Sequence, residues 1–451
     1  MTSPAGGATI TFVVSPSLPA TGAFDAHHPP SRNLVDDCVH CGFCLPACPT
    51  YALWGSEADS PRGRIHLMRV ALDGRVEITE DFARHFDTCL GCMACMTACP
   101  SGVQYDKLVE STRSQIERHT TRTLANRFFR RLIFAVFPYP NRLRWVALGL
   151  WQYQASGLQR LFRATGLVRL LPARLRAMEA MTPQVSLAGA WRRTQKIIAA
   201  EGGRRRRVGL LLGCVQRVFF SKVTAATARV LSAEGCEVVV PPRQGCCGAL
   251  MLHAGLEAEA AAMARQFIDA FDGAEIDTLV INAAGCGSTL KEYGHLLRDD
   301  PAYAAKAAAL AAKCQDISEV LAELKPRALR HPIPLTVAYH DACHLQHAQG
   351  VSAEPRRVLA TIPGLKVRDI PESGLCCGSA GIYNLMEPAT AQELGERKVG
   401  HLLTTGADAV VSSNPGCLLQ LESGLRTAGR EMRTMHLVEL LDASIRGTMP
   451  M

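Results

Sequence analysis

The chain has 451 residues, of which 48% are hydrophobic and 20% are charged, and its formal net charge is +8. This composition is typical of a soluble globular protein with a sizeable core, and the length suits about three domains. The mild charge excludes the concentrated basic face of a nucleic-acid-binding protein. Cysteine is the unusual component, with 18 residues.

The cysteine content does not indicate a secreted disulfide framework. The first 24 residues lack a positively charged region, so no signal peptide is predicted. No run reaches the roughly 18 uninterrupted apolar residues of a membrane span. In a reducing compartment, clustered cysteines serve metal binding or redox chemistry. We therefore expect a cytoplasmic protein whose cysteines have one of these two roles.

The part of the chain before residue 208 divides into three regions. Residues 1–31 are rich in Pro, Ser, Gly and Ala, which predicts a flexible tail. Residues 32–118 carry the two densest cysteine clusters, and residues 119–207 are Arg-rich and mostly helical. Within this helical linker, "RFFRRLIFAVFPYPNRLRWVALGLW" mixes arginine with Phe, Trp and Leu, as an interfacial membrane helix does. We favour a helical hairpin that covers the domain at 32–118, with peripheral membrane association at the inner face of the cytoplasmic membrane at most.

Both cysteine clusters have the spacing Cys-x2-Cys-x2-Cys-x3-Cys-Pro, in "CVHCGFCLPACP" and "CLGCMACMTACP". This is the bacterial ferredoxin run for [4Fe–4S] clusters, in which the fourth cysteine ligates the other cluster. Structural zinc prefers cysteine pairs separated by a longer loop, so zinc is disfavoured here. The predicted ligands are Cys38, Cys41, Cys44 and Cys99 for cluster 1, and Cys89, Cys92, Cys95 and Cys48 for cluster 2.

Two such clusters carry electrons one at a time and have no hydride chemistry of their own. The chain shows no Gly-x-Gly-x-x-Gly after a strand, so no dinucleotide or flavin site is predicted in it. A partner that carries out the two-electron chemistry is implied.

From residue 208 onward, short apolar runs alternate with Ala-rich helical segments. The strand-like runs are "RVGLLLGCV", "CEVVVPP", "IDTLVINAAGC", "LTVAYHDAC" and "ADAVVSSNPGC". This alternation predicts parallel sheets built from βαβ units.

Four cysteines of this half occur twice with a nearly constant offset. Cys214, Cys246, Cys247 and Cys286 are followed, 129 to 131 residues later, by Cys343, Cys376, Cys377 and Cys417. The repetition indicates one domain used twice, at 208–330 and 331–451. The predicted fold is α+β overall: a mainly helical two-cluster ferredoxin-like domain, followed by two duplicated α/β cysteine-rich domains.

Each cysteine quartet is a candidate metal site. Its members follow three strand-like runs, and the carboxyl ends of parallel strands line one crevice. Adjacent cysteines bond to each other only with strain, so we interpret each pair as two ligands of one metal centre. Gly248 and Gly378, which follow the pairs, are expected to let the backbone approach the bound group closely. The alternative is burial as small apolar side chains, which we favour for the lone Cys236 and Cys314.

Several stretches carry a resemblance to a known family. "DCVHCGFCLPACPTYALWGSEADSPRGRIHLM" and "TCLGCMACMTACPSGVQYDKLVE" resemble the iron–sulfur subunit of bacterial glycolate oxidase, and so do "GCVQRVFFSKVTAATARVL", "INAAGCGSTLKEYGH" and "LCCGSAGIYNLMEP". The repeats resemble the cysteine-rich "CCG" domains shared with heterodisulfide reductase, the lactate-utilisation iron–sulfur protein and anaerobic glycerol-3-phosphate dehydrogenase. The resemblance spans roughly residues 32–440.

The resemblance implies an electron-transfer subunit of glycolate dehydrogenase (glycolate oxidase) with no catalytic residues of its own. It would take electrons from FAD-containing subunits and pass them toward quinone or the respiratory chain. Three alternatives stay open. The repeats could act on a disulfide, the chain could serve a lactate or glycerol-3-phosphate dehydrogenase, or the repeats could form a zinc-stabilised interaction platform.

The sequence departs from the family pattern at one point. The fuller repeat ends in Cys-x-x-Cys, and some relatives hold a noncubane [4Fe–4S] cluster there. Here the endings are "GCGS" and "GCLL", so the last cysteine is absent from both repeats. An additional iron–sulfur cluster, zinc or unmetallated thiols therefore remain open for the quartets. His344 and His253 could replace a ligand, but we favour a supporting or surface role for both.

Overall fold

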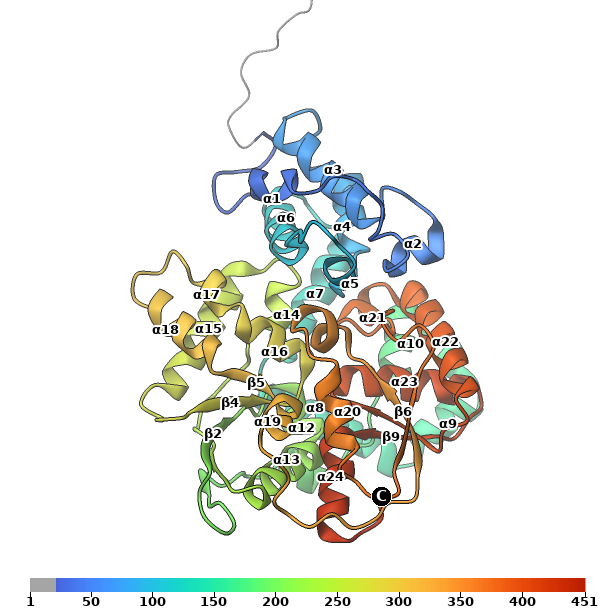
Figure 1. The fold of residues 1–451 in the computed structure, drawn as a ribbon. Coiled ribbons are helices and arrows are strands. Elements are labelled where there is room, and N and C mark those ends of the chain that lie inside the picture. Colours follow the sequence, from blue (N-terminus) through green and yellow to red (C-terminus); the bar gives the residue numbers. More distant parts are fainter. Residues whose placement is uncertain (1–21, 451) are drawn as a thin grey trace, which may run out of the picture.

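In the computed structural model, which describes residues 22–450, a small helical domain rests on two α/β repeats (Figure 1). The helical domain is blue in the figure, the first repeat is green to yellow, and the second is orange to red. The predicted α+β fold class and the order of its parts are confirmed.

The N-terminal domain is built from short helices around one apolar core. Pro61 occupies the first turn of α3, where its missing N–H is not needed, and the Ser60 hydroxyl caps this helix by accepting a hydrogen bond from Gly63 N at 3.0 Å. Met68, Phe86 and Leu108 meet in the core. The helices are α1 (Arg32–Asp36), α2 (Pro49–Trp54), α3 (Pro61–Leu72), α4 (Glu80–Asp87), α5 (Ala94–Thr97) and α6 (Tyr105–His119).

The expected flexible tail is wrong for residues 22–31, while residues 1–21 lie outside the described part of the chain. Phe24 is only 3% exposed and belongs to the core of the N-terminal domain. The Asp25 carboxylate accepts a hydrogen bond from Arg118 Nε at 2.8 Å, and Asp25 N donates to Gln115 Oε1 at 2.9 Å. One aromatic side chain and one ion pair therefore fix a segment whose composition predicted mobility.

The linker region is helical, as predicted, but it packs on the repeats. Phe129 and Ile133 enter the core of the first repeat, and Leu143 packs against Val218 of that repeat. The expectation that this hairpin covers the N-terminal domain is therefore wrong. The helices are α7 (Leu124–Val136), α8 (Pro140–Ala155), α9 (Leu158–Ala164), η1 (Leu167–Leu170), α10 (Ala173–Ala180) and α11 (Leu187–Ala190). Across residues 22–450, every helix is too short or too polar to cross a membrane.

The first repeat contains a five-stranded sheet of order β1-β3-β2-β4-β5, parallel except for β1. Residues 197–198 add the antiparallel edge strand, so this sheet begins before the predicted boundary at 208. The strands are β1 (Ile197–Ile198), β2 (Arg206–Leu210), β3 (Cys236–Val239), β4 (Thr278–Ile281) and β5 (Cys314–Asp316). The helices are α12 (Val215–Phe219), α13 (Ser221–Ala233), α14 (Ala249–Leu252), α15 (Glu257–Phe271), α16 (Ala284–Lys291), α17 (Tyr293–Leu296), α18 (Ala304–Ala312) and α19 (Ile317–Glu323).

The second repeat has a parallel four-stranded sheet of order β7-β6-β8-β9, which matches β3-β2-β4-β5 of the first. The predicted duplication is thus present as a duplicated topology. The strands are β6 (Thr336–His340), β7 (Lys366–Asp369), β8 (Ala409–Ser412) and β9 (Arg433–His436). The helices are η2 (His344–Ala348), α20 (Ala353–Leu359), α21 (Tyr383–Met386), α22 (Pro388–Thr404), α23 (Pro415–Thr427) and α24 (Leu437–Arg446).

The two repeats share one core. Val208 and Leu210 of β2 belong to the same apolar cluster as Val337 of β6 and Leu441 of α24. Helix α24 packs on α13 of the other repeat, and Arg229 Nε donates to Asp442 Oδ1 at 2.9 Å across this contact. The repeats are therefore fixed relative to each other by burial as well as by charge.

The glycines after the cysteine pairs have a packing role that differs from the expected approach to a bound group. Gly248 and Gly378 have φ of 83° and 88°, in the left-handed region. A Cβ at Gly378 would lie 2.6 Å from the Ala391 carbonyl oxygen on α22, and a Cβ at Gly248 would lie 3.1 Å from the Ala260 oxygen on α15. Each glycine lets the cysteine loop contact a helix backbone.

Replacing Gly378 with alanine should lower the free energy of unfolding by about 3 kcal/mol, because the left-handed strain and the backbone collision add. The matched control is Gly429→Ala, since Gly429 has φ of 64° and open space where a Cβ would lie. That control should lose only about 1 kcal/mol. Denaturant unfolding of both variants measures the difference, and equal losses would contradict the collision.

Candidate metal centres

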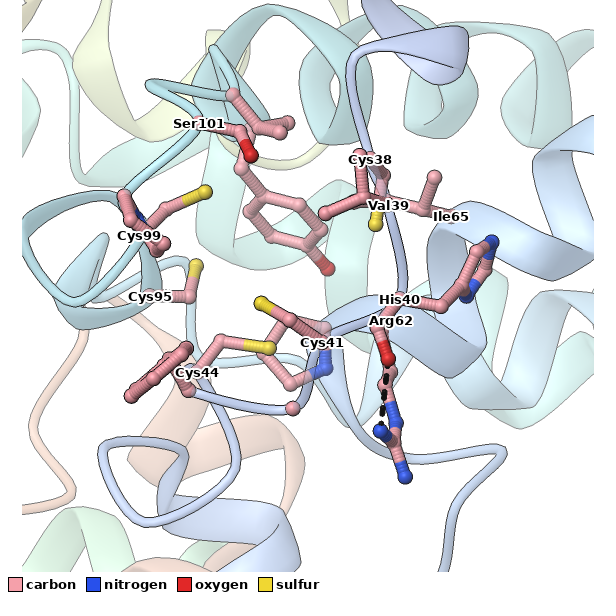
Figure 2. Close-up of a pocket in the computed structure, with 16 residues that line it drawn as sticks. Cys38, Val39, His40, Cys41, Cys44, Arg62, Ile65, Cys95, Cys99 and Ser101 are labelled. Atoms are coloured by element: carbon pink, nitrogen blue, oxygen red, sulfur yellow. Dashed lines mark hydrogen bonds between the residues drawn. The ribbon is translucent and has the colours of Figure 1, made fainter.

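The first ferredoxin-type cavity is lined by cysteines from both motifs. Cys38, Cys41 and Cys44 come from the loop between α1 and α2, and Cys99 follows α5. Figure 2 shows these sulfurs and that of Cys95 around one space. Gly42, at φ 89°, helps the loop to turn tightly around that space. On the wall of the cavity, Arg62 Nη1 donates to His40 O at 3.0 Å and holds the loop to α3.

The second cavity has the complementary composition. It is lined by Cys89, Cys92 and Cys95 from the second motif and by Cys48 from the first. Cys48 occupies the N-cap position of α2, immediately before Pro49. The start of this helix therefore places the Cys48 thiol beside the cysteines of the second motif. The two cavities share Cys95 and Tyr105 as wall residues and are therefore neighbours.

Two arginines, Arg64 fully buried and Arg113 partly buried, set the electrostatics of the second cavity. Arg64 is 1% exposed and donates to His85 O at 2.5 Å, while Arg113 Nη2 donates to Phe86 O at 3.0 Å and also to Cys89 O. Burial alone would raise the pKa of the Cys89 thiol, but Arg64 and Arg113 reverse this and lower it. Burial raises the pKa of Cys92 and Cys95 well above its ordinary value. These two thiols need a further positive charge to exist as thiolates.

In both repeats the loops after three parallel strands bring the cysteines of a quartet together. Cys246 Sγ lies 3.4 Å from Cys214 Sγ in the first, and Cys343 Sγ lies 3.9 Å from Cys376 Sγ in the second. Asn414 Nδ2 donates to Cys417 Sγ at 3.2 Å. The predicted convergence within each repeat is therefore present. Cys236 and Cys314 lie in strands and are buried in the core, as expected for packing residues.

The structure also brings the two quartets to one cavity of about 450 Å³, which the sequence did not predict. The linker contributes apolar walls from α8 and α10, including Leu143, Val146 and Met178. The thiols on the wall are those of Cys214, Cys246, Cys247, Cys286, Cys343, Cys376 and Cys417. A mainly apolar chamber between the repeats thus has sulfur on both sides.

The second quartet lies directly against the second ferredoxin motif. Leu90 and Cys92 belong to one apolar cluster with Cys376 and Tyr383. The Tyr383 hydroxyl donates to Thr88 O at 3.1 Å. Cys343 is close enough to Cys92 to contribute to the raised pKa of that thiol, although burial is the larger cause. The second cavity and the second quartet are therefore neighbours across the domain contact.

Comparison with known protein families matches these parts of the chain in order. Residues 34–103 match a 4Fe-4S dicluster domain, and residues 125–182 match the linker region of the glycolate oxidase iron-sulfur subunit. Residues 208–291 and 337–422 each match a cysteine-rich domain.

Whole-chain similarity decides the family. The chain is 40% identical to the probable glycolate oxidase iron-sulfur subunit of Bacillus subtilis, over 90% of this chain and 93% of the relative. It is 36% identical to the glycolate oxidase iron-sulfur subunit of Escherichia coli, over 92% and 95% of the two chains. The chain belongs to the glycolate oxidase iron–sulfur subunit family. Lactate utilization protein A of Geobacillus kaustophilus is 31% identical but covers only 52% of this chain.

This member of the glycolate oxidase iron–sulfur subunit family is thus an electron-transfer subunit of an oxidoreductase, and its cavities suit iron–sulfur clusters. Cysteine thiolates are the usual ligands of such clusters, and each ferredoxin-type cavity offers at least four. When bound, a cluster accepts and releases one electron at a time. The polypeptide provides the two arginines and the thiols, which are buried in the second cavity and partly buried to exposed in the first.

The two histidines considered as replacement ligands have other partners. His344 Nε2 donates to Gly91 O at 2.8 Å, so this ring links the second repeat to the second ferredoxin motif. His253 Nδ1 lies 3.1 Å from Glu110 Oε1, and its ring packs 5.0 Å from that of His344. Burial lowers the pKa of both histidines to about 4. Both rings therefore support the domain contact in the neutral form.

Sequence reasoning missed a third histidine. His340 is the last residue of β6 and lies with Cys377 and Cys417, so that one ligand atom from each falls within 4.8 Å of the other two. An alignment of the two repeats would have drawn attention to this position, because the first repeat has Leu211 three residues before its first cysteine and the second has His340.

Proposed function

We propose that this chain carries electrons from an FAD-containing subunit that oxidises glycolate, through two [4Fe–4S] clusters, toward quinone or another acceptor of the respiratory chain. The observation that carries the proposal is the pair of neighbouring cavities, in which the first three thiols of one motif meet the fourth thiol of the other, with Cys95 on the wall of both. Glycolate is taken from the names of the relatives, which align with nearly the whole chain.

The proposed ligand sets follow the lining of the cavities. Cluster 1 is held by Cys38, Cys41, Cys44 and Cys99, and cluster 2 by Cys89, Cys92, Cys95 and Cys48. Cys95 borders both cavities, and we give it to cluster 2 because the middle cysteines of a ferredoxin run serve their own cluster. This exchange of the fourth ligand keeps the clusters adjacent, which favours electron transfer between them.

Replacing Cys48 with alanine should remove cluster 2 and lower the iron content from about eight to about four atoms per chain, since each cluster holds four irons. Iron and acid-labile sulfide of anaerobically purified protein measure this, and the magnetic interaction between reduced clusters should disappear from the EPR spectrum. The control is Cys314→Ser, because that thiol donates to Leu310 O at 3.3 Å in the core and a hydroxyl can do the same. An unchanged iron content in the Cys48 variant would contradict the assignment.

The electron-transfer proposal is tested on the complex with its flavoprotein subunits. Under anaerobic conditions, addition of glycolate should bleach the visible absorption of the clusters and produce the EPR signal of reduced [4Fe–4S] centres. Lactate and glycerol 3-phosphate serve as comparison substrates, because related iron–sulfur proteins are named for lactate utilization. If dithionite reduces the clusters and glycolate does not, glycolate is refuted as the electron donor. Reduction by lactate alone would instead assign the chain to a lactate-oxidising enzyme.

A disulfide reductase is the second candidate function, and the chamber between the repeats favours it. Seven thiols line this cavity, and the second quartet borders cluster 2. Cleavage of a disulfide takes two electrons and two protons and yields two thiols, with the electrons supplied one at a time by the clusters. A complex reduced with one equivalent of donor separates the two functions: reoxidation by a small disulfide supports the reductase, and reoxidation only by quinone supports the respiratory route.

We also propose that the linker contacts the membrane surface peripherally. Residues 118–178 contain twelve arginines and neither aspartate nor glutamate. Leu124, Phe128 and Leu132 are exposed at four-residue spacing along one face of α7, with Phe128 72% exposed, and Trp145 of α8 is 71% exposed. Exposed apolar side chains among arginines are typical of helices that lie in the interface of an anionic bilayer.

Replacing Phe128, Leu132 and Trp145 together with serine should weaken binding to anionic liposomes at low salt by about tenfold or more, because apolar burial supplies much of the binding energy. Co-sedimentation measures binding. Leu329→Ser is the control, since Leu329 is 73% exposed outside the linker. If the unmodified chain stays in the supernatant, the linker is not a membrane contact.

A further inference from the structure

His340 is a buried histidine whose ring, in the described part of the chain, meets no polar group but the neighbouring Cys377 thiol. It is 1% exposed at the end of β6, and neither Nδ1 nor Nε2 makes a hydrogen bond of good geometry among the residues the structure describes. A neutral imidazole has one N–H donor and one lone-pair acceptor, and leaving such groups unpaired in the core is unfavourable. A nitrogen of this ring is therefore free to bind a metal ion.

The groups nearest to His340 are metal ligands. Cys377, from the loop after β7, and Cys417, in the first turn of α23 after β8, join His340 with ligand atoms all within 4.8 Å of one another. All three side chains are buried. The Cys343–Cys376 pair, 3.9 Å apart, belongs to the same quartet. Lys398, 1% exposed, is close enough to Cys376 and Cys377 to offset thiolate charge.

The spacing favours a single ion. Zinc binds sulfur at about 2.3 Å and nitrogen at about 2.0–2.1 Å in a tetrahedron, so its ligand atoms lie about 3.8 Å apart or less. The ligand atoms of His340, Cys377 and Cys417 all lie within 4.8 Å of one another, so a single ion can reach all three. In a cubane cluster each thiolate binds a different iron, which requires wider spacing. The donor set of thiolates with one imidazole is also that of Cys₃His structural zinc sites.

The first repeat lacks the corresponding imidazole. Leu211 stands three residues before Cys214, as His340 stands three residues before Cys343, and Leu211 is buried in an apolar cluster. The first quartet consists of four thiols beside a leucine. The duplicated fold has thus given the two repeats different donor sets at the same position.

We propose that the second repeat binds one zinc-type ion through His340, Cys377, Cys417 and one thiolate of the Cys343–Cys376 pair, and that the first repeat does not form this site. The ion fixes the second quartet against the second ferredoxin motif. It changes no oxidation state, so electrons bypass it, and it is independent of which substrate reduces the clusters. Thiolates bound to it are unavailable for disulfide chemistry.

The test is metal analysis and zinc X-ray absorption spectroscopy on the full chain purified anaerobically with its iron–sulfur clusters. We expect about one zinc per chain, with one imidazole and three sulfurs in its coordination shell. His340→Leu, which installs the residue of the first repeat, and Cys417→Ser should each lose at least tenfold in zinc affinity, measured by competition with a chelator. The matched controls His253→Leu and Cys286→Ser should retain it.

Iron content and circular dichroism identify the variants that fail to fold. If His340→Leu does not fold, the zinc absorption spectrum of the unmodified protein tests the imidazole ligand instead. His340→Cys should keep zinc but replace the imidazole signal with a fourth sulfur. Zinc without imidazole, iron in place of zinc at the second quartet, or equal loss in the control variants would overturn the proposal. None of these outcomes depends on reduction by glycolate, so the test is separate from that of the proposed function.

Discussion

Buried thiolate charge has to be balanced, and the arrangement of this protein around residues 89–99 follows from that requirement. Arg64 and Arg113 supply fixed positive charge beside Cys89, and both are held by backbone carbonyls of the same domain. Cys92 and Cys95 are equally buried and have raised pKa values without such a partner. Iron of the proposed cluster 2 would supply the missing charge. The charge balance of this part of the N-terminal domain thus adds to its apolar packing.

The second ferredoxin motif is also where the N-terminal domain meets the second repeat. His344 donates to Gly91 O, the hydroxyl of Tyr383 donates to Thr88 O, and Thr97 is hydrogen-bonded to His347 Nδ1 at 2.9 Å. These bonds join two segments about 250 or more residues apart in the chain. One short loop thus borders a cluster cavity on one side and a cysteine quartet on the other, which places the second ferredoxin motif at the contact between the two domains.

Duplication has produced two similar sheets with different surroundings. Their four parallel strands have the same order, and in each a cysteine pair followed by a left-handed glycine comes after the second of these strands in the chain. The second repeat packs Cys376 and Tyr383 against Leu90 and Cys92 of the ferredoxin motif, and it has His340 where the first repeat has Leu211. The first repeat instead receives Phe129 and Ile133 of the linker in its core. The repeated topology brings both quartets to one chamber, while the contacts of each repeat decide what its thiols can bind.

The sequence by itself determined the chemistry that depends on local spacing. The two ferredoxin runs, the strand-like segments and the constant offset of the quartets predicted the domain types and the cysteines that line each cavity, because ligands on one tight loop and residues after one strand have fixed local geometry. Only the tertiary structure decided the rest. Phe24 and Asp25 are fixed by partners far along the chain, and the linker helices pack on the repeats rather than on the N-terminal domain. The shared chamber and the position of His340 beside Cys377 and Cys417 depend on how separate strands are ordered in a sheet and how two sheets pack, which is set by long-range burial that no local pattern encodes.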